Sequence, residues 1–185
     1  MAEILPESNN KQTLEKRNLE IKARVSDVKS AIDAAESLSA SYEGVLHQTD
    51  TYFHCSSGRL KLREIRQDNV EPKAELIYYN RPDNNGERWS SYFLAPVSNP
   101  SELKELLTHS NGLRGVVDKA RTLYLWNGCR IHLDQVTNLG DYLEFEVVSD
   151  GDAEDDQRRM DRLVEAFEIK VEDTIAGSYS DLLGI

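Results

Sequence analysis

The sequence predicts a mainly β domain of the α+β kind, an eight-stranded antiparallel closed β-barrel or tunnel with flanking amphipathic helices. Three observations predict it. Eight segments have the composition of strands, and short turn sequences separate several of them. Charged and apolar residues alternate along many of these segments, as they do on strands with two different faces. Three further segments carry apolar residues at helical spacing and can cover the apolar side of a sheet.

Length and composition bound the class of protein. The chain has 185 residues, of which 39% are hydrophobic and 30% charged, which is typical of one soluble globular domain. The net charge of −11 argues against a general nucleic-acid partner. There is no apolar run of about 18 residues and no secretory signal pattern, so we expect no membrane partner. Cys55 and Cys129 lack a CxxC spacing, and a reduced, cytoplasmic location is the simplest expectation.

The domain organisation follows from two shifts in composition. Residues 1–16 are polar and lack a hydrophobic period, which predicts a disordered N-terminal tail. Residues 17–185 then form a single domain, because no long linker or internal repeat interrupts them. The acidic run Ser149–Asp156 predicts a solvated loop that leads into a helix.

Helical spacing predicts three amphipathic helices. The first follows Ser26, a plausible N-cap residue, and the second begins with Asn99 and Pro100 and ends near Gly112. A last short helix is predicted from Tyr179 to Leu183. The apolar faces of the three longer helices contain Val28, Ala31, Ile32, Ala35 and Leu38; Leu103, Leu106 and Leu107; and Met160, Leu163, Val164 and Phe167.

Turn residues divide the rest of the chain into strands. Asn127-Gly128, between two alternating runs, is the strongest hairpin signal in the sequence. The eight predicted strands are Arg17–Val25, Thr49–Cys55, Arg59–Ile65, Lys73–Arg81, Glu87–Ala95, Leu113–Trp126, Cys129–Val136 and Asp141–Ser149.

Charges of one sign gather on single strand faces. The basic faces contain Arg59, Lys61 and Arg63 on one strand and Lys119 and Arg121 on another, and an acidic face contains Glu144 and Glu146. The ordinary interpretation of one such face is the solvated side of a sheet. Sorting by sign indicates instead a shared site with two halves. Guanidinium and ammonium groups bind phosphate oxygens, and carboxylates bind a hard cation. A complex of a metal ion with a triphosphate needs both halves.

The same residues resemble the CYTH family, the triphosphate tunnel metalloenzymes, and in particular its class IV adenylyl cyclase branch. The resemblance covers roughly residues 17–184 and consists of several motifs in the family's order. They are Asn18-Leu-Glu20-Ile-Lys22, similar to the ExExK signature; Gln48–Phe53 and Gly58–Arg63; Ile77–Pro82; Lys119-Ala-Arg121; Arg130–Asp134 with Leu139–Asp141 and Leu143–Glu146; and Ser178–Gly184.

This resemblance implies a tunnel, a cofactor and a set of site residues. It implies Mg²⁺ or Mn²⁺ held by Glu20, Glu144 and Glu146 with Asp134 nearby, and it places Lys22, Lys119 and Arg121 in catalysis. Members similar to this chain often pair, so a homodimer is a further expectation. Asn18 departs from the signature, because it replaces a glutamate and brings no charge to the metal. The residues implied to bind the triphosphate are Lys22, Lys61, Arg63, Arg81, Lys119, Arg121 and Arg130.

Three functions remain open at this point. The first is an adenylyl cyclase that converts ATP to cyclic AMP and pyrophosphate. The second is a hydrolase of tripolyphosphate, thiamine triphosphate or a nucleoside triphosphate, and the third is a polyphosphate or nucleotide binder without activity, for which Asn18 is the support. Several side chains allow two interpretations. Tyr78, Tyr79 and Trp89 are nucleobase contacts or ordinary packing residues, and Asp50 and Glu64 are tunnel ion-pair partners or solvated groups. His132 lies on the charged face and either contacts phosphate or does not.

Overall fold

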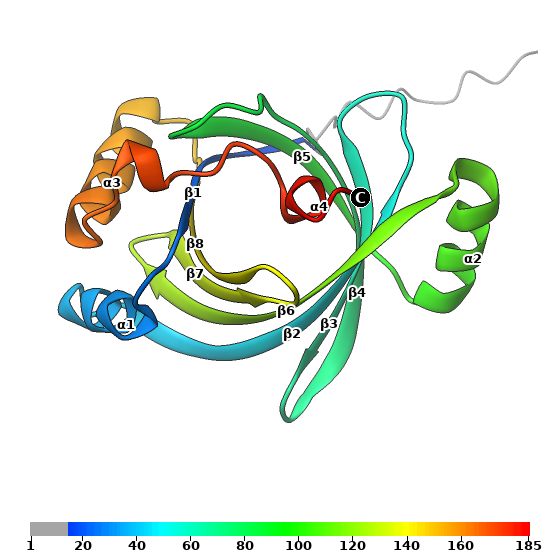
Figure 1. Cartoon of the computed structure of the whole chain (residues 1–185), viewed down its shortest axis with the longest axis horizontal. Helices are drawn as coiled ribbons and strands as arrows, with labels where there is room; N and C mark the ends of the chain where they lie inside the picture. The colour runs from blue at the N-terminus through cyan, green and yellow to red at the C-terminus, as the bar shows by residue number, and fades with distance from the viewer. Residues whose placement is uncertain (1–14) are drawn as a thin grey trace, which may run out of the picture.

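The chain folds into one closed antiparallel barrel (Figure 1). The computed structural model describes residues 15–185, and around the barrel the strands follow the order β1-β5-β4-β3-β2-β6-β7-β8. Helices flank this ring, so the predicted fold class is confirmed. The predicted tail over residues 1–16 lies outside the described residues up to residue 14, and β1 begins at Lys16.

The strands agree with the predicted segments to within three residues at each end, except at the start of β2. That strand begins at Ser41 rather than at Thr49, because its first part pairs with the long β6. A register shift at Gly44, whose φ is 112°, interrupts the alternation there and hides the strand in the sequence. The bounds are β1 Lys16–Arg24, β2 Ser41–Phe53, β3 Arg59–Gln67, β4 Val70–Asn80, β5 Arg88–Pro96, β6 Leu113–Trp126, β7 Cys129–Val136 and β8 Gly140–Val148.

Side-chain caps begin the helices. Asn99 accepts a hydrogen bond from the backbone of Glu102, as predicted. The prediction of Ser26 as the first N-cap was wrong, because Asp27 takes that place and accepts from the backbone N–H of Lys29. The helices are α1 Val28–Ser37, α2 Pro100–Asn111, α3 Ala153–Ala166, the 3₁₀ turn Val171–Asp173, and α4 Tyr179–Leu182.

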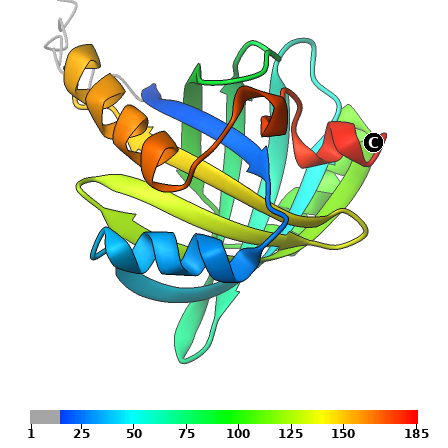
Figure 2. The same ribbon diagram turned by 60° about the vertical axis from the view of Figure 1, so that its left-hand side comes forward.

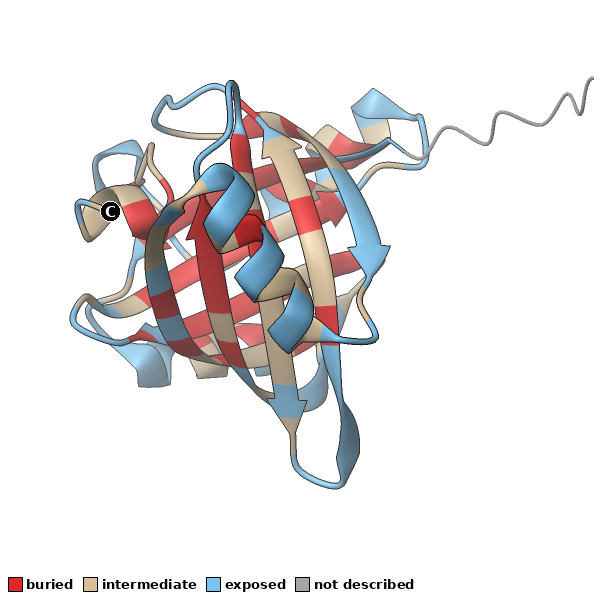
Figure 3. Cartoon of the chain, turned by 90° about the vertical axis from the view of Figure 1, so that its right-hand side faces the viewer, coloured by how far each residue is buried: buried red, intermediate tan, exposed pale blue. Residues whose placement is uncertain are grey.

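The apolar core lies between the barrel wall and the helices. Helices α1 and α3 cover the outer face of β7, β8 and β1 (Figure 2), where Ile131, Phe145 and Met160 are fully buried. Helix α2 lies across the opposite wall (Figure 3), where Leu107 packs against Leu62. No helix of residues 15–185 combines the length and the apolar character needed to cross a membrane. Because the apolar faces point outward, the inward faces carry the charged side chains.

The β6–β7 hairpin sets a register that matters for the interior. Asn127 and Gly128 both have positive φ, 45° and 73°, and the strands pair from Trp126 and Cys129 onward. This is the tight turn that the sequence predicted. Its register places Arg121 opposite Asp134, which brings a base from β6 and an acid from β7 together inside the barrel.

Candidate active site in the barrel interior

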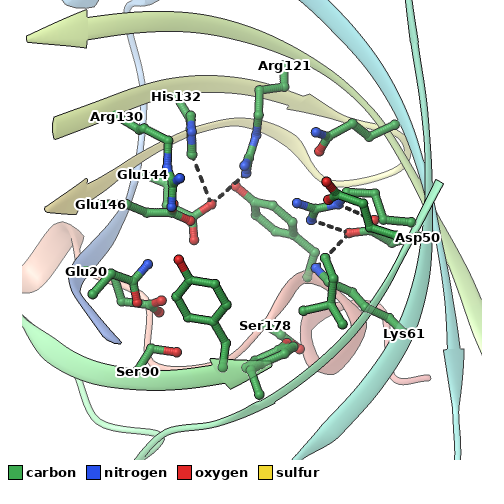
Figure 4. Close-up of a pocket in the computed structure, with 18 of the residues that line it drawn as sticks. Glu20, Asp50, Lys61, Ser90, Arg121, Arg130, His132, Glu144, Glu146 and Ser178 are labelled. Atoms are coloured by element: carbon green, nitrogen blue, oxygen red, sulfur yellow. Dashed lines mark hydrogen bonds and ion pairs between the residues drawn. The ribbon is translucent and has the colours of Figure 1, made fainter. Parts of the chain in front are cut away.

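A cavity of about 310 Å³ lies inside the barrel (Figure 4). Its wall comes from alternate residues of all eight strands and from the segment that enters α4. Charged side chains that are two residues apart on one strand lie on the same face, and here that face points into the barrel. Those that line the cavity include the predicted phosphate-binding residues Lys22, Lys61, Arg63, Arg81, Lys119, Arg121 and Arg130.

Asp50 organises one half of this wall. Its carboxylate accepts hydrogen bonds from Lys61 Nζ at 3.0 Å, from Lys119 Nζ at 3.0 Å, and from two nitrogens of Arg63 at 2.7 and 2.8 Å. Only 1% of Asp50 is exposed. Of its two predicted readings, the ion-pair partner is therefore the correct one. One buried carboxylate thus holds three basic side chains of β3 and β6 close together, and these side chains can also donate hydrogen bonds to a phosphate.

Glu144 organises the other half. Its Oε1 accepts from Lys22 Nζ at 2.8 Å and its Oε2 from Arg121 at 2.6 Å. Arg121 also makes a two-pronged pair with Asp134, at 2.6 Å for each nitrogen. The hydroxyl of Tyr179 donates to Asp134 at 2.8 Å. Arg121 is therefore fixed by two carboxylates and points across the cavity toward the acidic strand.

Glu20 is held by arginines that also bind the C-terminal segment. Arg81 and Arg88 each lie 3.0 Å from its Oε1. Arg88 additionally donates to the backbone oxygen of Ile175 at 2.8 Å, and Arg81 to that of Ala176 at 3.4 Å. These arginines therefore link the first strand of the site to the residues that enter α4.

Glu146 and His132 complete the acidic side. Arg130 pairs with Glu146 Oε2, at 2.5 and 2.7 Å. His132 is 3% exposed, and its Nδ1 has no hydrogen-bond partner; Glu144 Oε2 is 3.8 Å away. One ligand atom from each of His132, Glu144 and Glu146 can be chosen such that all lie within 4.8 Å of one another.

Burial and pairing shift the titration of these groups in opposite directions. Burial raises the pKa of Glu20 to about 7, although Arg81 acts against it. Burial also tends to raise the pKa of Asp134 and of Glu146. The neighbouring Arg121 outweighs this effect for Asp134, and Arg130 does so for Glu146, so that each pKa falls to about 2. Burial lowers the pKa of Lys61 to about 7. The site therefore holds carboxylates that stay charged beside groups that titrate near neutrality.

The two ends of the barrel differ. At one end Tyr52, Val117, Val136 and Tyr142 continue the inward faces and pack with Tyr179 of α4 in a buried apolar cluster. Figure 1 shows α4 within the outline of the ring. This cluster seals that end behind the charged band. The sequence motif at residues 178–184 therefore reaches the cavity wall through Ser178 and Tyr179.

The other end carries aliphatic side chains on the inward faces. They lie beyond the charged residues on neighbouring strands, and Leu94 is 37% exposed. Trp89 and Tyr78 do not contribute, because Trp89 packs with the outer core and Tyr78 pairs with Phe93 on the opposite face from Leu94. Tyr79 does line the cavity. The aliphatic residues that face this mouth are Leu46, Ile65, Leu94 and Leu123, and the charged side chains of Lys16 and Glu75 line the same end.

Comparison with known proteins gives the family. The model of the CYTH domain matches residues 16–179. The chain belongs to the CYTH family. A search of curated proteins found no match. The PH1012 protein of Pyrococcus horikoshii OT3 is 26% identical, with a TM-score of 0.76, and the match covers 89% of this chain and 98% of that chain.

Other solved CYTH-like barrels share the fold at lower identity. A candidate adenylate cyclase from Vibrio parahaemolyticus is 18% identical with a TM-score of 0.73, covering 91% of this chain and 98% of that one. HpAC1 from Hippeastrum, a candidate adenylyl cyclase described as having a dominant triphosphatase activity, is 16% identical with a TM-score of 0.60. That match covers 87% of this chain and 91% of the other. These likenesses concern the fold.

The residues present fit the divalent metal that the CYTH family implies. Glu20, Glu144 and Glu146 lie on neighbouring strands, with Glu20 opposite Glu146 in the register of β1 and β8. Two buried acceptors in the same wall, Asn18 Oδ1 and His132 Nδ1, have no hydrogen-bond partner. Unsatisfied buried acceptors beside carboxylates suit a cation.

Sequence reasoning missed Arg88 and left Tyr179 without a role. Arg88 is 3% exposed, but it is the first residue of β5 and has no charged neighbour at the next inward position, so alternation gave no signal. The place of Tyr79 in the cavity wall could have been predicted from the sequence, since Tyr79 shares a strand face with Arg81. Glu64 faces outward and pairs with Lys104 of α2.

Proposed function

We propose that this protein is a divalent-metal-dependent adenylyl cyclase of the class IV type, which converts ATP to cyclic AMP and pyrophosphate. The observation that supports it is the division of one cavity into a charged band and an aliphatic mouth. Phosphates fit the band, and an apolar nucleobase face fits the mouth. Inorganic tripolyphosphate has no group that would use the mouth.

In this proposal the sealed end receives the terminal phosphates. Lys61, Arg63 and Lys119, held in place by Asp50, bind the phosphates that become pyrophosphate. Their positive charge stabilises the negative charge that develops as pyrophosphate leaves. Because these groups are already oriented, little reorganisation is needed when the substrate binds.

The acidic half lies beside the reacting phosphate. Lys22 and Arg121 contact the α-phosphate side of the chain, and Glu20, Glu144 and Glu146 hold the Mg²⁺ or Mn²⁺. A bound dication would supply charge neutralisation and would lower the pKa of the attacking hydroxyl. The 3′-oxygen of ATP forms a bond to the α-phosphorus, the bond to the β-phosphate oxygen breaks, and the hydroxyl proton goes to solvent. Asp134 acts by holding Arg121, since Arg121 and Tyr179 occupy its oxygens.

Triphosphate hydrolysis is the second candidate. HpAC1, which has the same fold, is described as having a dominant triphosphatase activity. The charged band would bind the substrate in the same way, and water would replace the 3′-hydroxyl as the nucleophile. Hydrolysis makes no use of the aliphatic mouth when the substrate is tripolyphosphate, so the two candidates differ in which residues affect turnover.

Product identification separates these candidates. The protein is incubated with ATP or with tripolyphosphate, in Mg²⁺ or in Mn²⁺, and the products are identified by mass. Cyclic AMP with pyrophosphate supports the cyclase; orthophosphate without cyclic AMP supports the hydrolase. Ligand-induced stabilisation without turnover identifies a binder. Glu144→Gln abolishes either activity, whereas Glu105→Gln on the exposed face of α2 leaves it unchanged.

A pair of neighbouring residues tests the aliphatic mouth. Leu94 faces the cavity and Phe93 faces outward, with similar exposure of 37% and 42%. Leu94→Ser removes apolar contact and should raise the KM for ATP about tenfold. Phe93→Ser should leave that KM unchanged. Equal effects of the two substitutions would exclude the mouth as the nucleobase site.

A further inference from the structure

His132 lies in the cavity wall, and within residues 15–185 no hydrogen bond reaches its Nδ1. It projects from β7 directly opposite Glu144 of β8. A histidine at a cross-strand position beside a carboxylate commonly donates a hydrogen bond to it. Here Nδ1 is 3.8 Å from Glu144 Oε2, which is too long for such a bond.

The Nδ1 atom is both buried and unpartnered. His132 is 3% exposed, and Nδ1 has no partner among the residues that the structure describes. A buried polar atom without a hydrogen-bond partner destabilises the protein unless a ligand or ion satisfies it. Carboxylate oxygens of Glu144 and Glu146 lie close enough to share one small ion with this ring, since the three donor atoms fall within 4.8 Å of one another.

The surrounding charges show which donor atoms are free. Lys22 and Arg121 engage the two oxygens of Glu144, and Arg130 engages Oε2 of Glu146. Within residues 15–185, no hydrogen bond or ion pair reaches Oε1 of Glu146. The least committed donors in this cluster are thus Oε1 of Glu146 and Nδ1 of His132.

A mixed nitrogen and oxygen donor set has a chemical preference. Mg²⁺ favours oxygen ligands and keeps its water, whereas first-row transition ions accept imidazole nitrogen. We propose that His132 is a nitrogen ligand in this site and makes it select a first-row transition dication, such as Mn²⁺, over Mg²⁺. The proposal rests on the proposed function in placing the metal in the same cavity, but it concerns binding and not turnover.

Pulsed electron paramagnetic resonance tests the ligand directly. The full chain, stripped of metal, is loaded with Mn²⁺, once alone and once with tripolyphosphate. Coupling between Mn²⁺ and a ¹⁴N nucleus is expected in at least one of these samples. Bound Mn²⁺ without nitrogen coupling in both samples, or no bound Mn²⁺ in either, would overturn the proposal. The measurement needs no substitution and no activity, so a protein that turns over neither substrate can still pass or fail it.

Competition between metals gives the second readout. Mg²⁺ is titrated against bound Mn²⁺ in the wild type, in His132→Gln and in His109→Gln, a control in the last turn of α2. We expect His132→Gln to lose the ¹⁴N coupling and to lower the preference for Mn²⁺ about tenfold, with Mg²⁺ affinity nearly unchanged. His109→Gln should behave as the wild type. An unchanged preference in His132→Gln, with the coupling retained, would show that another nitrogen binds the ion and would overturn the proposal.

Discussion

The substitution Asp50→Asn removes a buried negative charge that Lys61, Arg63 and Lys119 share. Asparagine keeps the shape and can accept a hydrogen bond, but it leaves three cations facing one another. Removing one partner of a buried ion pair costs roughly 3–5 kcal/mol. Burial raises the pKa of Asp50, yet its three cationic neighbours outweigh that effect and hold it well below the usual range. The carboxylate is therefore charged at neutral pH, and its loss leaves buried basic groups without their partner.

Thermal unfolding measures this cost. For a domain of this size, each kcal/mol moves the melting temperature by about 2–4 °C, so a fall of roughly 6–20 °C is expected. Tripolyphosphate brings negative charge to the same cations. The melting temperature of Asp50→Asn should therefore rise more on adding tripolyphosphate than that of the wild type.

The control for this prediction is Asp118→Asn. Asp118 is exposed on β6, next to Lys119 in the sequence, and its side chain accepts from Thr49 on the outer wall at 2.6 Å. Its loss should cost at most about 0.5–1 kcal/mol. The reasoning is refuted if Asp50→Asn melts within about 2 °C of the wild type, or if tripolyphosphate raises both melting temperatures equally.

Further predictions concern Lys61 and the sealed end. Burial lowers the pKa of Lys61 to about 7 in the free protein, so triphosphate binding between pH 7 and about 10.5 should be accompanied by proton uptake, and the affinity should fall as the pH rises. Calorimetry in two buffers of different ionisation enthalpy measures this uptake, and Lys61→Arg should reduce it. Tyr179→Phe removes a hydrogen bond to Asp134 and should cost about 1.5–3 kcal/mol in urea unfolding. Gly115→Ala places a Cβ 2.5 Å from the Ile185 side chain and should destabilise by about 1–3 kcal/mol, less when combined with Ile185→Ala.

Local patterns were sufficient to predict the strands, the Asn99 cap and the inward charged faces. The hairpin at Asn127-Gly128 is an example, because the turn needs positive φ at both residues and this pair tolerates it. Ser26 shows where local pattern fails: two adjacent residues can both cap, and the choice between Ser26 and Asp27 depends on the path of the chain out of β1.

Pairing across the barrel could not be predicted, because it depends on register between distant strands. Asp134 and Glu144 are both acids on inward faces, and both carboxylates are paired in the structure, Asp134 with Arg121 and Tyr179 and Glu144 with Lys22 and Arg121. Nothing in their sequence neighbourhoods distinguishes a potential ligand from an ion-pair partner. Arg88 is a similar case, since its partner Glu20 is known only from the β1–β5 pairing. The roles predicted for these residues in binding and catalysis stay predictions.

The sorting of charge explains how a chain of net charge −11 can bind a polyanion. Eight of its 22 Lys and Arg residues line the barrel cavity, where carboxylates neutralise most of them in the free protein. A triphosphate that binds Lys22 and Arg121 replaces Glu144 as their partner and releases its oxygens for a cation. A dication that binds Glu144 likewise releases those bases for phosphate. In the proposed function, each ligand would therefore lower the cost of binding the other, and by linkage the effect would be the same in both directions.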